Sequence, residues 1–289
     1  MTGEASPSAG VTIVTGAASG MGLATARRLL RPREIMLLVD LDAAKLDAVR
    51  ADLAEHAAGP EWVHTAVADV TDPDAMAQLA ETVRALGPFR TLAHAAGISP
   101  TMGTWWPIVH VDLVGTARIL EALLPLAEPG TAAVCWASNS AYIGATPAGD
   151  PVLDAILDDP LAPDLRDRLA AALDGRWDVP GGSGAAYGWA KRGVIRLVRR
   201  EARAWGARGA RLLSVSPGII NTPMARQELE QQPMMQVMLD STPVPRMGAA
   251  SEVADLVAFL VSDSAGYLTG ADILIDGGVS TTIERMLNP

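Results

Sequence analysis

A tyrosine and a lysine stand four residues apart, at Tyr187 and Lys191, in a segment of helical character. This spacing places both side chains on one face of a helix. An ammonium near a phenol favours the phenolate, so such a pair can exchange a proton with an alcohol or carbonyl oxygen. Ser138 follows an apolar run and can hydrogen-bond the same oxygen. Most Tyr–Lys pairs at this spacing only decorate a helix surface, but this chain has three tyrosines and two lysines in all.

A glycine-rich turn at residues 15–22 follows the first apolar run and precedes a helical segment. Gly16 permits a sharp turn, Gly20 permits close approach of a pyrophosphate, and Gly22 permits close packing of the helix on the sheet. The helix N-terminus then offers free N–H groups to phosphates. The turn therefore predicts a dinucleotide site, whose contacts we expect at Gly16, Ser19, Gly20, Met21 and Gly22.

Two acidic residues end the next two apolar runs. Asp40 stands 18 residues after Gly22, close to the spacing of about 20 at which an acid binds the adenosine ribose hydroxyls. A carboxylate there repels a 2′-phosphate, so we expect NAD(H) rather than NADP(H). The alternative is a helix N-cap, which Asp40 or Asp42 could provide. Asp69 and the adjacent Val70 are expected at the adenine.

Composition excludes several classes of protein. The chain has 289 residues and a formal net charge of −10, which repels the phosphates of nucleic acids. Its one cysteine excludes a disulfide framework, and its four histidines lack metal-ligand spacing. No apolar run approaches the ~18 residues of a membrane span, and the N-terminus has no secretion signal. We expect a cytoplasmic protein without a bound metal, a nucleic-acid partner or a membrane span.

Short apolar runs alternate with helical segments along the chain. Runs without polar alternation are typical of strands buried on both faces of a parallel sheet. They occupy residues 11–15, 35–40, 62–67, 91–95, 132–136, 212–215 and 273–275. Helix signals between them include Leu46, Val49 and Leu53 at helical spacing, a cap and proline at Asp72–Pro73, and a Ser251 cap. The pattern predicts an α/β fold with a doubly wound parallel sheet of Rossmann type.

The predicted organisation is a flexible tail at 1–10 followed by a single NAD-binding catalytic domain at 11–289. Residues 145–184 interrupt the alternation with five prolines and a helix-compatible piece, Asp164–Leu173. We expect a helical insertion that acts as a lid or a contact surface, although a plain surface loop is the alternative.

Together these motifs resemble the short-chain dehydrogenase/reductase superfamily over residues 11–278. The resemblance also covers Asp69-Val70, Ala95-Ala96-Gly97, Ser216-Pro217-Gly218, Thr222-Pro223-Met224 and residues 267–278. Within it, the insertion and the stretches at 203–206 and 244–248 are most similar to the bacterial 3α-hydroxysteroid dehydrogenase/carbonyl reductase group.

The resemblance implies specific roles. Tyr187 would be the acid/base, Lys191 would hold the nicotinamide ribose and lower the tyrosine pKa, and Ser138 would orient the substrate oxygen. The remaining cofactor contacts would come from Ala96, Gly97, Pro217, Gly218, Ile220 and Thr222. The catalytic asparagine usual in the family is replaced by Asp112, which could pair with Lys191 and stay ionised. Ala95 replaces a second asparagine, with an effect expected on local packing.

Residues 222–247 would form a substrate lid. Its methionines, at 224, 234, 235, 238 and 247, suit an apolar ligand, although ordinary helix packing is the alternative. Trp105, Trp106 and Trp177 are expected near the substrate, and the four histidines are read as structural.

The resulting hypothesis is an NAD-dependent oxidoreductase for a hydrophobic secondary alcohol or ketone, steroid- or terpenoid-like, assembled as a homodimer or homotetramer. The alternative is a non-catalytic NAD-binding regulator on the same fold, and an epimerase-type relative is a third, weaker interpretation. Because a regulator need not keep Ser138, Tyr187 and Lys191, their presence favours the enzyme.

Overall fold

The computed structural model describes residues 10–143, 146, 148–179, 182–231 and 233–287. Seven parallel strands form one sheet in the order β3-β2-β1-β4-β5-β6-β9. Their bounds are β1 Val11–Thr15, β2 Ile35–Asp40, β3 Val63–Val67, β4 Phe89–His94, β5 Ala132–Trp136, β6 Arg211–Pro217 and β9 Asp272–Ile275. The chain order reverses between β1 and β4, the place where ligands bind in such sheets. The predicted doubly wound sheet is confirmed, and its strands agree with the apolar runs to within two residues.

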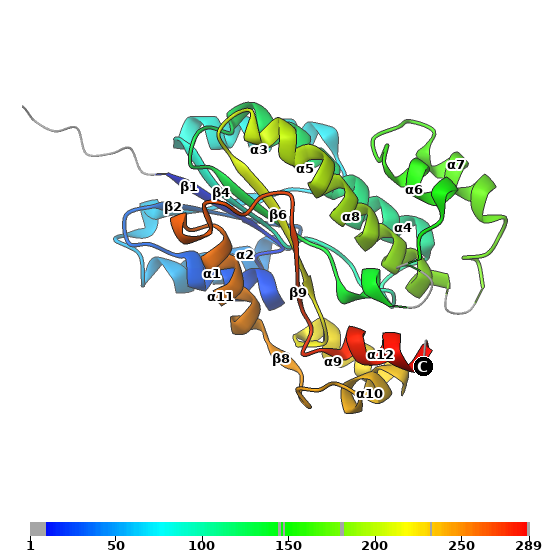
Figure 1. Cartoon of the computed structure of the whole chain (residues 1–289). Helices are drawn as coiled ribbons and strands as arrows, with labels where there is room; N and C mark the ends of the chain where they lie inside the picture. Colours follow the sequence, from blue (N-terminus) through cyan, green and yellow to red (C-terminus); the bar gives the residue numbers. More distant parts are fainter. Residues whose placement is uncertain (1–9, 144–145, 147, 180–181, 232, 288–289) are drawn as a thin grey trace, which may run out of the picture.

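Helices cover both faces of this sheet (Figure 1). One layer contains α3 (Pro73–Leu86), α5 (Thr116–Leu123) and α8 (Gly182–Gly206), and the other contains α1 (Gly20–Leu29), α2 (Ala43–Ala54) and α11 (Ala250–Leu260). Neighbouring strand residues point to opposite layers, so that Ile13 joins one apolar core and Val14 the other. The strands are therefore buried on both sides, as their unbroken apolar character predicts.

Helix caps agree with the sequence in part. Asp72 caps α3, Pro73 occupies its first position and Gly87 ends it, as predicted. The predicted Ser251 cap of α11 is wrong, because the helix begins one residue earlier with Ala249 as its N-cap. The Glu252 carboxylate accepts the Ala249 N–H at 2.7 Å, which satisfies a donor that Ser251 cannot reach from inside the helix.

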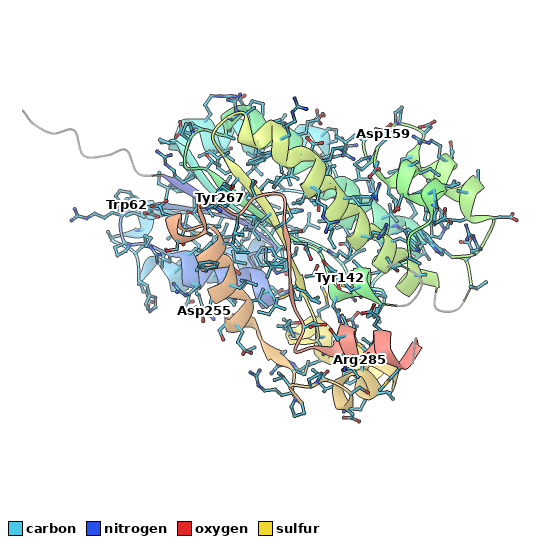
Figure 2. All side chains as sticks on the ribbon, in the orientation of Figure 1. Trp62, Tyr142, Asp159, Asp255, Tyr267 and Arg285 are labelled. Atoms are coloured by element: carbon cyan, nitrogen blue, oxygen red, sulfur yellow. The ribbon has the colours of Figure 1, made fainter. Side chains whose placement is uncertain are left out.

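The insertion forms two helices, α6 (Pro151–Leu157) and α7 (Leu165–Leu173), and α6 packs beside α8 (Figure 1). The Asp154 carboxylate receives two hydrogen bonds of 2.8 Å from the Arg192 guanidinium, and Asp158 pairs with Arg196. Asp159 lies between the two helices, where Figure 2 labels it. The insertion is thus fastened along the outer side of α8, the helix that carries Tyr187.

The chain between β6 and α11 includes α9 (Pro223–Gln231) and α10 (Pro233–Asp240), and α12 (Val279–Leu287) follows β9. These three helices gather at one end of the sheet (Figure 1). A short pair of parallel strands, β7 (Ile220–Asn221) and β8 (Gly248–Ala249), brackets the predicted lid segment. The predicted tail lies outside the described residues except for Gly10. Over the described ranges, no helix has the length and apolar character needed to cross a membrane.

Candidate active site

The glycine turn leads from β1 into α1 with the expected tight geometry. Gly16 has a φ of +64°, and a Cβ at this position would lie 2.9 Å from the Ala95 carbonyl carbon. A Cβ at Gly22 would lie 2.1 Å from the Gly16 oxygen, so only glycine lets the helix start this close to the strand. Ser19 is the N-cap residue and α1 begins at Gly20. The first turn of α1 therefore has free N–H groups next to a turn without side chains.

A pocket lies above this turn, at the carboxyl ends of β1, β2 and β4. It brings together most of the predicted cofactor contacts, which are Gly16, Ser19, Gly20, Met21, Gly22, Asp40, Asp69, Val70, Ala96, Gly97 and Thr222. Pro217 ends β6 but does not line this pocket. Among the described residues, no Lys or Arg lines the pocket above the glycine turn.

The Asp40 carboxylate is held by backbone groups. Its Oδ2 accepts the Ala18 N–H of the glycine turn at 3.0 Å, and its Oδ1 accepts the Leu41 N–H at 2.8 Å. The N-cap of α2 is Asp42, which accepts the Lys45 N–H. The capping role therefore belongs to Asp42, and Asp40 faces the pocket.

Tyr187, Lys191 and Ser138 come together between α8 and the end of β5. The Lys191 Nζ lies 5.4 Å from the centre of the Tyr187 ring, and Tyr187 and Ser138 line the same pocket. The Ser138 hydroxyl also accepts the Ser140 N–H at 3.1 Å, which fixes its position. Lys191 is 4% exposed and donates to the Trp136 carbonyl at 3.2 Å. One helix face thus carries the phenol and the ammonium, as the spacing predicts.

Asp112 reaches Lys191 from a π-helical segment, His110–Gly115, between α4 (Trp105–Val109) and α5. Its side chain is fully buried and its Oδ2 lies 3.7 Å from the Lys191 Nζ. Its Oδ1 accepts the Ile98 N–H at 2.9 Å. A Cβ at Gly97 would lie 2.8 Å from this oxygen, so the close approach requires glycine. The predicted pairing of Asp112 with Lys191 is confirmed, and its π-helical setting was not predicted.

The pKa values at this site shift in the direction opposite to the expectation. Burial raises the pKa of Asp112 above its ordinary value, although Lys191 acts in the opposite direction. Burial also raises the pKa of Tyr187, and the Asp112 charge raises it further, while the nearby Ser138 hydroxyl acts in the opposite direction. The expected lowering of the tyrosine pKa is therefore wrong for this site.

A buried histidine links the glycine turn to the Asp112 segment. The Thr116 hydroxyl donates its proton to the Asp112 carbonyl at 2.7 Å, so at 3.1 Å it can only accept from His94 Nε2. The other ring nitrogen, Nδ1, then accepts from the Thr15 hydroxyl at 2.8 Å. This arrangement needs the neutral ring, and burial lowers the pKa of His94 to about 3. The structural role expected for His94 is confirmed.

A second pocket adjoins the first and contains Ser138 and Tyr187. Met21, Thr222 and Met224 line both pockets, so these three residues lie where the two meet. The lid helices contribute Met235 and Met238, and the segment after β6 contributes Gly218, Ile219 and Ile220. Among the predicted lid methionines, Met247 does not line this pocket, and the side chain of Met234 is outside the described set.

Two features of this pocket differ from the sequence prediction. Trp105, Trp106 and Trp177 do not line it; they pack edge-to-face on one another, where the insertion meets α4. The tryptophan that does line it is Trp189 of α8. Sequence reasoning also missed Glu228 of α9, a half-buried carboxyl in the lining. The only sequence feature that marks Glu228 is its position as an acidic residue within a methionine-rich lid segment.

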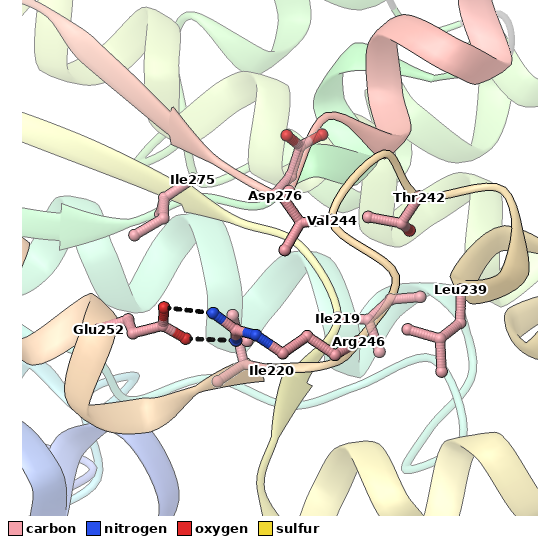
Figure 3. A pocket seen from close by; sticks show the side chains of 11 residues that line it. Ile219, Ile220, Leu239, Thr242, Val244, Arg246, Glu252, Ile275 and Asp276 are labelled. Atoms are coloured by element: carbon pink, nitrogen blue, oxygen red, sulfur yellow. Dashed lines mark hydrogen bonds and ion pairs between the residues drawn. The ribbon is translucent and has the colours of Figure 1, made fainter.

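A third hollow, drawn in Figure 3, lies on the other side of the segment after β6. Its walls are Ile219, Ile220, Leu239, Val244 and Ile275, and the Arg246 guanidinium at its edge is already paired with Glu252. None of Ser138, Tyr187 and Lys191 lines it, although it shares Ile219 and Ile220 with the pocket that contains Ser138 and Tyr187.

Comparison with known proteins gives consistent matches. A family model described as short chain dehydrogenase matches residues 10–143, and one described as enoyl-(acyl carrier protein) reductase matches residues 175–280. Levodione reductase of Leifsonia aquatica is 30% identical over 301 residues, which cover 97% of this chain and 99% of the relative. The 3-alpha-hydroxysteroid dehydrogenase/carbonyl reductase of Comamonas testosteroni is 28% identical over 281 residues, with 95% and 98% covered. A crystal structure of levodione reductase superposes with a TM-score of 0.74 at 28% identity, covering 94% of this chain and 98% of that one.

The buried His94 predicts a pH dependence of stability. Its pKa is about 3 in the folded chain against 6.5 ordinarily, so between these values only the unfolded chain binds the proton. The contribution of the neutral His94 ring to the free energy of unfolding is complete above pH 6.5. It falls by about 1.4 kcal/mol for each pH unit below that value. Urea unfolding at about pH 6 and pH 5 measures this slope, and His94→Asn should make it shallower by about that amount. The exposed His56→Asn is the control, and identical slopes for His94→Asn and the parent chain would contradict the assignment.

Proposed function

The chain belongs to the short-chain dehydrogenase/reductase family and is an oxidoreductase of alcohol and carbonyl groups, and we propose that it transfers a hydride between NAD(H) and a hydrophobic secondary alcohol or ketone. One observation carries the proposal: Ser138 and Tyr187 line a mainly apolar pocket that adjoins the pocket above the glycine turn and shares three lining residues with it. The methionine-rich wall favours a bulky alicyclic substrate of steroid or terpenoid kind. The non-catalytic regulator has no observation in its favour.

The residues of the site suit this chemistry. NAD(H), when bound, accepts or supplies the hydride. The Ser138 hydroxyl hydrogen-bonds the substrate oxygen, and Tyr187 gives a proton to that oxygen in reduction or removes it in oxidation. Because the pKa of Tyr187 is raised, the phenol is neutral at neutral pH and ready to donate. Oxidation needs the phenolate and therefore accelerates as the pH rises.

The pocket above the glycine turn fits a dinucleotide with an unmodified ribose. The free N–H groups of α1 and the missing side chains at Gly16 and Gly20 accommodate a pyrophosphate. Asp40 can accept hydrogen bonds from the two ribose hydroxyls. A 2′-phosphate would meet this carboxylate without a Lys or Arg in the lining to offset its charge. These features support NAD(H) over NADP(H).

We also propose a cytoplasmic homodimer or homotetramer in which the insertion covers or extends the contacts between subunits. The ion pairs from Asp154 and Asp158 to α8 place α6 against the outer side of that helix. Any subunit that approaches this side therefore meets the insertion first. The domain limits given above, including the lid at 222–247, remain predictions.

The function is tested by Tyr187→Phe on a panel of hydrophobic secondary alcohols with NAD, followed by nicotinamide absorbance. Loss of the transferable proton should lower kcat by at least about 100-fold. NAD affinity should stay unchanged, since the ring remains. Tyr142→Phe is the matched control, because Tyr142 (Figure 2) donates instead to Asp272 at 2.6 Å and lies outside the pocket lining. Full turnover by Tyr187→Phe, or no oxidation of any alcohol by the parent enzyme, would refute the proposal.

Cofactor choice is tested by titration of both dinucleotides. The parent protein should bind NADH at least about tenfold more tightly than NADPH, a difference of about 1.4 kcal/mol. Asp40→Ala removes the repelling carboxylate and should bring the two affinities closer together. Asp42→Asn, which keeps the helix cap outside the pocket, should leave the ratio as it is. Tighter NADPH binding by the parent protein would overturn the assignment.

The influence of Asp112 on Tyr187 is tested by the pH profile of alcohol oxidation. Since the Asp112 charge raises the pKa of Tyr187, Asp112→Asn should move the alkaline rise of kcat to lower pH while activity persists. Asp154→Asn serves as the control, since it breaks an ion pair with Arg192, on the outer side of the same helix. An unmoved profile would mean that the Asp112 charge does not reach Tyr187. An inactive but NAD-binding variant would instead give the carboxylate its own part in proton transfer.

A further inference from the structure

The substrate pocket contains one acidic side chain, Glu228, on the lid helix α9. The remaining side chains of the lining are apolar, hydroxyl or amide groups, with Tyr187 as the second titratable residue. No Lys, Arg or His lines the pocket, and none occurs among the residues left undescribed. A carboxylate therefore faces an apolar pocket without a cation beside it.

Glu228 shares its pocket with the reacting groups. It lines the same pocket as Ser138 and Tyr187, and its side chain is half-buried. Burial raises the pKa of Glu228 above its ordinary value, because a charged carboxyl loses hydration among the surrounding groups.

The chemistry of a half-buried carboxylate restricts what it can face. It has acceptor oxygens only, and burying it against apolar groups without a donor is costly. A hydroxyl or an ammonium on the substrate would supply that donor, and a second carboxylate would add repulsion. The mainly apolar walls accommodate the carbon skeleton between this point and the reacting carbon.

We propose that Glu228 is a specificity-determining residue that selects alicyclic alcohols or ketones carrying a second hydrogen-bond donor, a hydroxyl or an amine, away from the reacting carbon. The inference rests on the proposed function, since the reacting carbon is the one served by Ser138 and Tyr187. It also implies discrimination against hydroxy acids.

A matched probe set tests this inference. Cyclohexanol, cyclohexane-1,4-diol, 4-aminocyclohexanol and 4-hydroxycyclohexanecarboxylate share one ring and differ in the group across it. Measured with NAD at one pH, kcat/KM for the diol and the amine should exceed that for cyclohexanol, and the acid should be the poorest. Glu228→Gln should reduce the preference of amine over acid by about tenfold or more, because a charge-assisted hydrogen bond is lost and a repulsion removed. Each ratio of kcat/KM compares two probes in the same enzyme, so any effect of the Glu228 charge on Tyr187 cancels.

Glu230→Gln is the control, since Glu230 is exposed on the same helix and should leave all ratios unchanged. An active Glu228→Gln enzyme with unchanged ratios would overturn the inference and leave the proposed function standing. If the parent enzyme oxidises no alcohol at all, the proposed function fails. Calorimetric binding of the amine and the acid to the NADH-loaded protein then decides the role of Glu228, and equal affinities in the parent and Glu228→Gln proteins would overturn it.

Discussion

The ammonium group of Lys191 is buried beneath the active site, held by the Asp112 carboxylate at 3.7 Å and by the Trp136 carbonyl at 3.2 Å. Removing one partner of such a buried pair typically costs about 3–5 kcal/mol, so the surrounding chain must keep both in place. This requirement explains why residue 97 lacks a side chain and why the helix before α5 widens into a π turn at Asp112.

The sheet and the glycine turn could be predicted because their signals are local. Val11–Thr15, Ile35–Asp40 and Ala132–Trp136 are strands with the bounds that the apolar runs suggest. Gly16 has a φ of +64° and Gly22 lies against the Gly16 oxygen, so these two requirements lie within a few residues of sequence, whereas the approach of Gly16 to Ala95 does not. Pairing of Tyr187 with Lys191 follows in the same way from the helical period.

The other features of the site depend on contacts between residues that are far apart in the sequence. The π turn at Asp112 arises where that carboxylate meets Lys191, 79 residues away in the chain. The direction of the pKa shift at Tyr187 was predicted wrongly for the same reason, because the balance between burial and a neighbouring charge is set by packing. Tryptophans 105 and 177 were assigned to the substrate, yet they join the insertion to α4, since aromatic groups pack equally well in either place. Glu228 had no distinguishing feature until α9 was placed over the pocket.

The ion pairs along α8 differ in their exposure to solvent. The side chains of Arg192 and Asp154 are 21% and 14% exposed, whereas those of Arg200 and Asp158 are 40% and 36% exposed. Dissolved salt screens exposed charges more strongly than sheltered ones. As ionic strength rises, the insertion should loosen first near Arg200, at the far end of the helix from Tyr187. The better sheltered pair of Arg192 and Asp154, which is nearer to Tyr187 on the helix, should persist to higher ionic strength and keep α6 against this part of α8.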